Sequence, residues 1–217
     1  MKFFLTRCVP FGERRHDVHT NLDLLNQIAT ADYSETRMEF VAGACKIDRF
    51  LGSVPQLNGT YFACVNSGGE NVRESSNVRR LPTDKFLELL RILATRRPVV
   101  LLGSKGDRDY YESLALPANV INLAGETSIS ECVQIIARAE KFFTTDCGLM
   151  HLAATTEIPI CAFFGPTHPE RKAPLRDNVE WLWGDEAVYD AEYDRRGRIP
   201  QHHYFTSFAL ANLTFRT

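Results

Sequence analysis

Beyond residue 60, the hydrophobic positions fall into short continuous apolar runs that alternate with longer amphipathic segments. The apolar runs are rich in Val, Ile, Phe and Cys, as buried strands are, and they cover residues 60–66, 98–103, 119–125, 141–148 and 158–165. Between these runs, apolar residues recur at helical spacing over residues 81–97, 106–116, 128–139 and 149–157. The pattern predicts five strands that alternate with four helices.

Strand–helix alternation with continuously apolar strands is typical of an α/β fold with a parallel sheet. Right-handed crossovers then place helices on both faces of the sheet, in a Rossmann-like arrangement. The loops that follow the strands lie together along one edge, and ligands of such folds bind at that edge. We therefore look for functional residues in these five loops.

The alternation divides the chain into three parts. Residues 1–59 lack it, although 17–29 have the apolar spacing of an amphipathic helix and could connect to another domain. Residues 60–183 form the predicted domain, and 184–217 form a surface segment rich in charged and aromatic residues.

Composition and charge narrow the function classes. With 44% hydrophobic and 24% charged residues, the chain is typical of folded globular proteins, and no apolar run is long enough to cross a membrane. The formal net charge of −2 excludes an overall basic field for nucleic acid, so any phosphate must be bound locally. Six cysteines without a C-x-x-C pair suit reduced thiols and a cytoplasmic location, with a peripheral position at the inner membrane left open.

The loop after the first predicted strand combines glycine and arginine. It reads NSGGENVRESSNVRRLP, with Ser67, Gly68 and Gly69 near its start and Arg79 and Arg80 near its end. Glycine lets backbone N–H groups approach an anion closely, and arginine matches phosphate in charge and geometry. The loop is either a phosphate-binding loop or a solvated basic loop.

The loop after the third predicted strand leads into a helix start. Thr127 or Ser128 can cap that helix, and Glu131 is placed to complete a capping box. Capping needs no ligand, but it is compatible with one, and both interpretations stay open.

The stretch TTDCGLMH places Asp146, Cys147, Gly148 and His151 where the fourth predicted strand gives way to a helix. Such a polar group faces the edge of the sheet and not its core. Asp146 could be only the helix N-cap, and His151 only a structural histidine. The last loop, FGPTHPERKAP, is predicted to form a stiff turn. No histidine has metal-ligand spacing, so we predict neither a metal nor a cofactor.

Taken together, the five loops resemble the donor-binding half of glycosyltransferase family 9, the ADP-heptose:lipopolysaccharide heptosyltransferases. The family pattern is a K-x-W-P loop, a strand ending in L-G, N-x-x-G-x-T-S-x-x-E, D-S-G-x-x-H-x-A-A and F-G-x-T-x-P. This chain has RRLP, LLG, NLAGETSISE, DCGLMHLAA and FGPTHP, in the same order and over roughly residues 60–176. The ordered set is far more specific than any one of its members.

The resemblance implies the second domain of a GT-B fold and an inverting, metal-independent transfer of a heptose-type sugar from an ADP-sugar to a lipopolysaccharide core acceptor. The predicted donor-binding residues are Ser67, Gly68, Gly69, Arg79, Thr127, Ser128, Asp146, Cys147, Gly148 and His151. Arg79 stands where the family has lysine and is the predicted catalytic residue, because a cation there stabilises the leaving phosphate. Cys147 stands at the family's serine position.

The resemblance also implies an acceptor domain, which would supply the base that deprotonates the incoming hydroxyl. About 59 residues precede the predicted domain, fewer than a typical domain has. The chain is therefore expected to be a piece of a longer protein, one half of a split enzyme, or a decayed member. The alternative function is a non-catalytic nucleotide-sugar-binding module, and a Rossmann-like fold with unrelated chemistry would be indicated by a preference for UDP.

Overall fold

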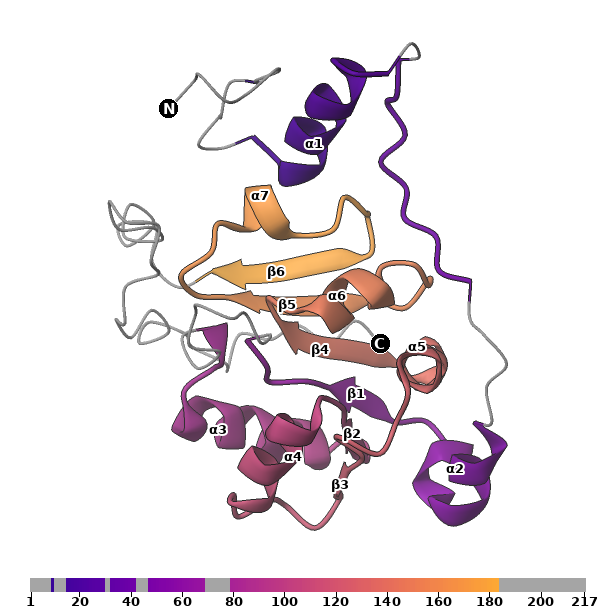
Figure 1. Ribbon diagram of the computed structural model, residues 1–217. Coiled ribbons are helices and arrows are strands. Elements are labelled where there is room, and N and C mark those ends of the chain that lie inside the picture. The colour runs from indigo at the N-terminus through magenta and orange to yellow at the C-terminus, as the bar shows by residue number, and fades with distance from the viewer. Residues whose placement is uncertain (1–8, 10–14, 30–31, 42–46, 69–78, 184–217) are drawn as a thin grey trace.

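The computed structural model describes residue 9 and residues 15–29, 32–41, 47–68 and 79–183 (Figure 1). Several predictions fall outside these ranges. They concern Gly69, Cys8, Cys45 and the segment 184–217.

Within the described residues, six strands form one sheet in which every neighbouring pair is parallel. The strands are β1 (Phe62–Cys64), β2 (Val99–Leu101), β3 (Val120–Asn122), β4 (Lys141–Thr145), β5 (Ile160–Phe164) and β6 (Val179–Trp183). Their order across the sheet is β3-β2-β1-β4-β5-β6. The five predicted strands and the parallel Rossmann-like sheet are confirmed, and β6 is an additional edge strand that the sequence analysis missed.

The four predicted helices are also present; the first and third begin later than predicted, the second and fourth begin one residue earlier, and all four end earlier. They are α3 (Thr83–Ala94), α4 (Lys105–Glu112), α5 (Ile129–Arg138) and α6 (Gly148–Ala153). The short helix α7 (Pro169–Lys172) joins β5 to β6, and α1 (Asp17–Asn26), α2 (Asp48–Ser53) and the 3₁₀ turn η2 (Pro55–Asn58) precede the sheet.

The two faces of the sheet bury separate hydrophobic cores, as the strand pattern predicts. Along β1 and the residue after it, Phe62 and Cys64 pack in the core with α3 and α4, whereas Ala63 and Val65 pack in the core with α5 and α6. Successive side chains of a strand point to opposite faces, so an unbroken apolar run serves both cores. The prediction of helices on both faces is therefore confirmed.

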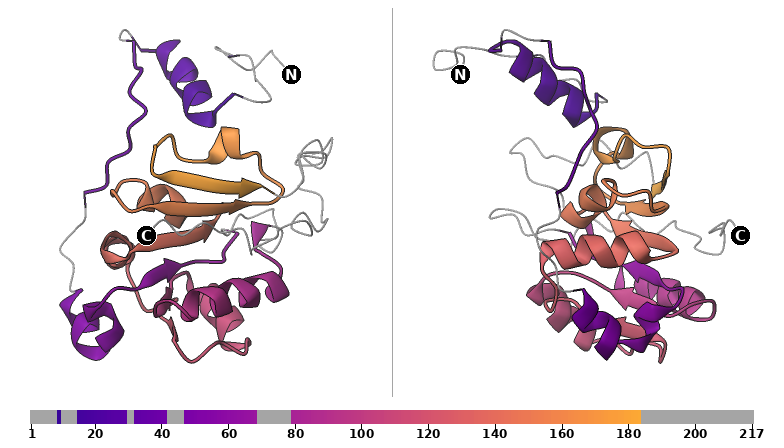
Figure 2. Two further views of the ribbon diagram at one scale, coloured as in Figure 1. Left: turned by 180° about the vertical axis from the view of Figure 1, so that it is seen from behind. Right: turned by 90° about the vertical axis from the view of Figure 1, so that its right-hand side faces the viewer.

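Helix α1 lies next to α7, beyond the β6 edge of the sheet (Figures 1 and 2). His16 accepts the Val18 N–H at Nδ1, so its Nε2 carries the proton and donates to the Ala173 carbonyl at 2.8 Å. Asp17 pairs with Arg171 at 3.0 Å and also with Lys172. These polar contacts fix the start of α1 against α7.

The apolar side chains of α1 are not buried in either hydrophobic core. The helix has no buried residue: Leu25 is 38% exposed, and Ile28, which lies just beyond the end of the helix, is 69% exposed. The predicted amphipathic helix is present but ends at Asn26. The described segment that follows, 32–41, runs along the side of the molecule toward α2 (Figure 1).

Within the described residues, no helix has the length and apolar character needed to cross a membrane. In the same residues, no three His, Cys, Asp or Glu side chains gather as metal ligands do.

Candidate functional site

The strand order creates a crevice between β1 and β4. From β1 the chain winds outward to β2 and β3, whereas β4 leads to β5 and β6 on the other side. The loops that leave the carboxyl ends of β1 and β4 therefore diverge, and ligands of open α/β sheets bind at this reversal point. Two of the loops singled out in the sequence, after Cys64 and after Thr145, meet there.

A pocket of about 390 Å³ lies at this crevice. Its walls come from the ends of β1, β2 and β4 and from the starts of α4, α5 and α6. They consist of Val65, Ser67, Gly103, Ser104, Asp107, Thr127, Ile129, Cys132, Cys147, Gly148, Leu149 and Leu152. The volume and the mainly apolar lining, with a few polar groups, are typical of a small-molecule site.

Four of the predicted site residues line this pocket, namely Ser67, Thr127, Cys147 and Gly148. Helix α6 begins at Gly148, where an added Cβ would meet no atom within 4 Å. The absence of a side chain at Gly148 thus leaves open space at the pocket wall.

The structure corrects one interpretation of Asp146. The N-cap residue of α6 is Cys147, in an extended conformation, and Asp146 precedes it. Asp146 is therefore not the helix cap. Its buried carboxylate lies 3.9 Å from Nε of Arg79.

Arg79 brings a positive charge to the mouth of the crevice. Besides facing Asp146, it donates from Nη1 to the Gly68 carbonyl at 3.4 Å. Its side chain is 16% exposed and that of Asp146 is 8% exposed. Two residues that are far apart in the sequence but were both predicted for the site are thus brought together, and Gly68 lies beside them.

Thr145 holds the first residues of the loop after β1. Its hydroxyl accepts the Ser67 N–H at 3.1 Å and donates to the Ser67 carbonyl at 2.5 Å. Both backbone groups of Ser67 are satisfied by a residue at the end of β4, so the loop starts from a fixed position across the crevice.

At the start of α5, the two candidate N-cap residues, Thr127 and Ser128, have different surroundings. Ser128 is the N-cap, and its hydroxyl and the Glu131 carboxylate form the predicted capping box. Thr127 lines the pocket instead, with its hydroxyl 3.0 Å from the sulfur of Cys132. The structure confirms the capping interpretation for Ser128, and Thr127 lines the pocket.

His151 lies outside the set of pocket-lining residues. Burial lowers its pKa, the Asp146 carboxylate raises it, and Lys172 and His16 lower it. The titratable groups that act on His151 are thus Asp146 at the crevice and Lys172 and His16 near α7 and α1. Neutral imidazole is the favoured form of His151 at neutral pH.

Asp107 and Gly103 belong to the pocket, but the sequence analysis proposed neither. Asp107 is only 2% exposed, and its carboxylate accepts from both the backbone and the hydroxyl of Ser104 at the start of α4. Gly103 has a φ of +152° and packs against that carboxylate. The spacing G-S-x-x-D at the end of an apolar run is a capping signal that could have drawn attention to them.

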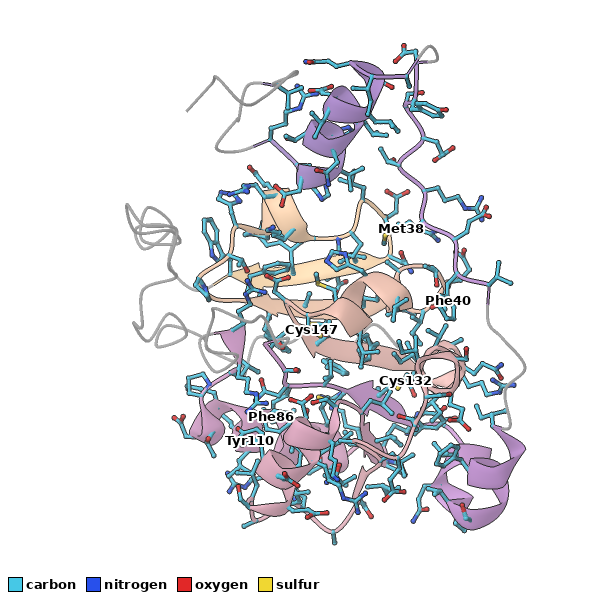
Figure 3. The ribbon with its side chains drawn as sticks, in the orientation of Figure 1. Met38, Phe40, Phe86, Tyr110, Cys132 and Cys147 are labelled. Carbon is cyan, nitrogen blue, oxygen red and sulfur yellow. The ribbon has the colours of Figure 1, made fainter. Side chains whose placement is uncertain are left out.

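The two pocket thiols are expected to react slowly. Cys132 is on α5 and Cys147 is just before α6 (Figure 3), and burial raises the pKa of both above that of an ordinary thiol. Since the thiolate is the nucleophile, we expect alkylation by iodoacetamide at pH 7.5 at least about tenfold slower than for a free thiol. The rate should still rise above pH 8.5, where an ordinary thiol begins to level off.

Peptide mapping by mass spectrometry after timed alkylation measures each cysteine separately. Cys64 and Cys161 are buried in the core on the α3 and α4 side, and they provide slow internal controls. Fast labelling of Cys132 or Cys147 that levels off below pH 8.5 would contradict the burial-raised pKa values.

Known proteins are similar to this chain in sequence and in fold. The family model described as glycosyltransferase family 9 (heptosyltransferase) matches residues 9–196. Lipooligosaccharide heptosyltransferase 2 of Haemophilus influenzae is 37% identical over 113 residues, which are 49% of this chain and 33% of that protein. The chain spans about a third of the length of the curated relatives it matches.

Two solved structures show the same fold. The family 9 glycosyltransferase of Veillonella parvula has a TM-score of 0.68 at 18% identity, over 84% of this chain and 54% of that one. The heptosyltransferase WaaC of E. coli, solved with ADP, has a TM-score of 0.54 at 20% identity, over 82% of this chain and 53% of that one.

Proposed function

The chain belongs to glycosyltransferase family 9, and from that premise we propose that it binds the ADP-sugar donor of a lipopolysaccharide heptosyltransferase. The observation that carries the proposal is the pocket of about 390 Å³ at the β1–β4 crevice, with the Arg79 guanidinium facing Asp146 and Gly68, which directly adjoin the pocket-lining residues Cys147 and Ser67 in the sequence. The apolar wall formed by Ile129, Leu149 and Leu152 suits a planar base. The polar residues at the ends of β1 and β4 suit the ribose and the phosphates.

The proposed chemistry is transfer of a heptose-type sugar to a hydroxyl of the lipopolysaccharide core. The acceptor oxygen attacks the anomeric carbon while the bond from that carbon to the β-phosphate oxygen breaks, which inverts the configuration. Negative charge then grows on the departing ADP. A guanidinium held in place before the reaction stabilises that charge, and this is the role proposed for Arg79.

The acceptor proton requires a base, which we assign to an acceptor-side domain, as the family resemblance implies. Residues 60–183 would then be the donor domain, and a cytoplasmic position at the inner membrane would bring it to its acceptor. A solved structure with the same fold supports the donor assignment, since the E. coli heptosyltransferase WaaC was solved with ADP.

Calorimetric titration of the chain with ADP and with UDP tests the proposal. We expect ADP to bind and UDP to bind at least about tenfold more weakly, because the base pocket is the specific part of the site. A subsequent assay with ADP-heptose and a core acceptor distinguishes an active enzyme from the alternative, a binding module or one half of a split enzyme. Preference for UDP, or binding of neither nucleotide, would contradict the proposed donor.

Gly148→Ala is expected to weaken ADP binding roughly three- to tenfold without loss of stability. The added methyl group meets no protein atom, so it enters the space that the ligand would fill. Alanine at the first position of α6 should hold or slightly raise the free energy of unfolding.

Gly52→Ala is the matched control, because Gly52 is also helical and its added methyl group also meets nothing within 4 Å. Calorimetry and urea unfolding of both variants give the two quantities. Equal ADP affinity in Gly148→Ala and Gly52→Ala would place the ligand away from α6.

A further inference from the structure

Arg80, the neighbour of Arg79, is fixed to the body of the domain. Its Nη2 donates to Oδ1 of Asp107 at 2.6 Å, and its guanidinium carbon lies 4.7 Å from the centroid of the Tyr110 ring. The Tyr110 ring is stacked on the buried ring of Phe86 at 6.4 Å, and the two lie side by side between α3 and α4 (Figure 3). Arg80 thus rests on a packed aromatic platform.

Asp107 is itself immobilised. Its Oδ2 accepts from the backbone N–H and the hydroxyl of Ser104, at 2.8 and 2.9 Å, while Oδ1 accepts from Arg80. Both carboxylate oxygens are therefore engaged, one by the start of α4 and the other by Arg80. A charge-assisted hydrogen bond with so little solvent access gives Arg80 a single geometry.

The next residue, Leu81, is held just as firmly. The amide side chain of the buried Asn66 accepts the Leu81 N–H at 2.7 Å and donates to the Leu81 carbonyl at 3.1 Å. Asn66 follows β1, and its own backbone N–H donates to the Tyr111 hydroxyl at 2.8 Å. Residues 80 and 81 are thus anchored to the first turn of α4 and to Asn66 just beyond the end of β1, respectively.

Arg79 directly precedes these two anchored residues, and its side chain contacts residues at the crevice. Its guanidinium faces Asp146, which follows β4, and the Gly68 carbonyl. The partner of Arg80, Asp107, follows β2 on the other side of β1 and lines the pocket wall there. We propose that Arg80, clamped between Asp107 and Tyr110, is a positioning residue that fixes Arg79 at the donor's diphosphate and does not itself touch the donor. This inference rests on the proposed function and adds a residue that acts through Arg79.

A double-mutant cycle with ADP and adenosine tests the inference. Because adenosine lacks the diphosphate, a residue that acts only through Arg79 should leave adenosine affinity within about twofold of wild type. Arg80→Gln should weaken ADP binding roughly five- to tenfold, and this loss should disappear in an Arg79→Gln background. Arg80→Lys, which keeps the charge beside Asp107, should recover most of the ADP affinity.

Arg108→Gln is the matched control. Arg108 lies in α4, next to Asp107 in the sequence, but it pairs with Glu112 and Glu126 at the surface. It should bind both ligands as wild type does. An equal loss of ADP and adenosine in Arg80→Gln would indicate a general structural role and overturn the inference. A loss that persists without Arg79 would indicate direct phosphate contact or repulsion by the unpaired Asp107, and would also overturn it.

A ligand-free measurement separates this inference from the proposed function. The ¹H–¹⁵N signal of Arg79 Nε, assigned with Arg79→Lys, should shift or broaden in Arg80→Gln and stay unchanged in Arg108→Gln. An unchanged signal in Arg80→Gln overturns the positioning role whether or not ADP binds. If wild type binds neither ligand, the proposed function fails, and this spectrum alone decides the positioning role.

Discussion

Arg79→Ala is expected to weaken ADP binding by roughly 10- to 100-fold and to change the free energy of unfolding by less than about 0.5 kcal/mol. The loss reflects one or two charge-assisted hydrogen bonds between the guanidinium and the diphosphate, each worth about 1.5–3 kcal/mol when largely desolvated. Stability should hold because the contacts of Arg79 with Asp146 and Gly68 are long, at 3.9 and 3.4 Å.

Arg97→Ala provides the matched control for the loss of one arginine. Arg97 lies just before β2, at the other end of the strand from the crevice, and its ion pair with Glu140 is well exposed. Calorimetry should find wild-type ADP affinity in this variant, and urea unfolding should show both variants folded. A folded Arg79→Ala protein with wild-type affinity for ADP would remove Arg79 from the donor site and from the proposed chemistry.

The hydrophobic pattern was sufficient for most of the fold because the inner strands β2, β1, β4 and β5 are buried on both faces. The sequence analysis missed the edge strand β6 because this strand is only partly buried and Glu180 interrupts its apolar run. Helix α6 ends earlier than its apolar residues indicate. The hydroxyls of Thr155 and Thr156 donate to carbonyls three residues earlier, and such local bonds compete with helix continuation.

The loops were predictable as the place of the site, but the direction of each side chain was not. Cys147 and Gly148 line the pocket, whereas His151, only three residues further along α6, is not among the residues that line it. The G-S-x-x-D spacing could have indicated Asp107 as a capping residue, but not its ion pair with Arg80, which is 27 positions away. Contacts across neighbouring strands of a parallel sheet join distant parts of the chain, so spacing within one motif does not reveal them.

Gly103→Ala is expected to lower the free energy of unfolding by about 2–4 kcal/mol, a large part of the 5–15 kcal/mol typical of a domain. Gly103 has a φ of +152°, which alanine rarely adopts. Its added Cβ would also lie 2.8 Å from both Cβ and Oδ2 of Asp107, closer than real Cβ atoms approach. The carboxylate cannot simply move aside, because Ser104 and Arg80 hold its two oxygens.

Urea unfolding of Gly103→Ala and of Gly52→Ala separates this strain from the general effect of adding a methyl group. Gly52 is in α2 with open space around its missing Cβ, so its alanine variant should be as stable as wild type or up to about 1 kcal/mol more stable. Equal stability of the two variants would mean that the backbone at residue 103 relaxes out of its positive φ without disturbing Asp107. In that case the capping box and the Arg80 anchor would be looser than the contacts around Asp107 indicate.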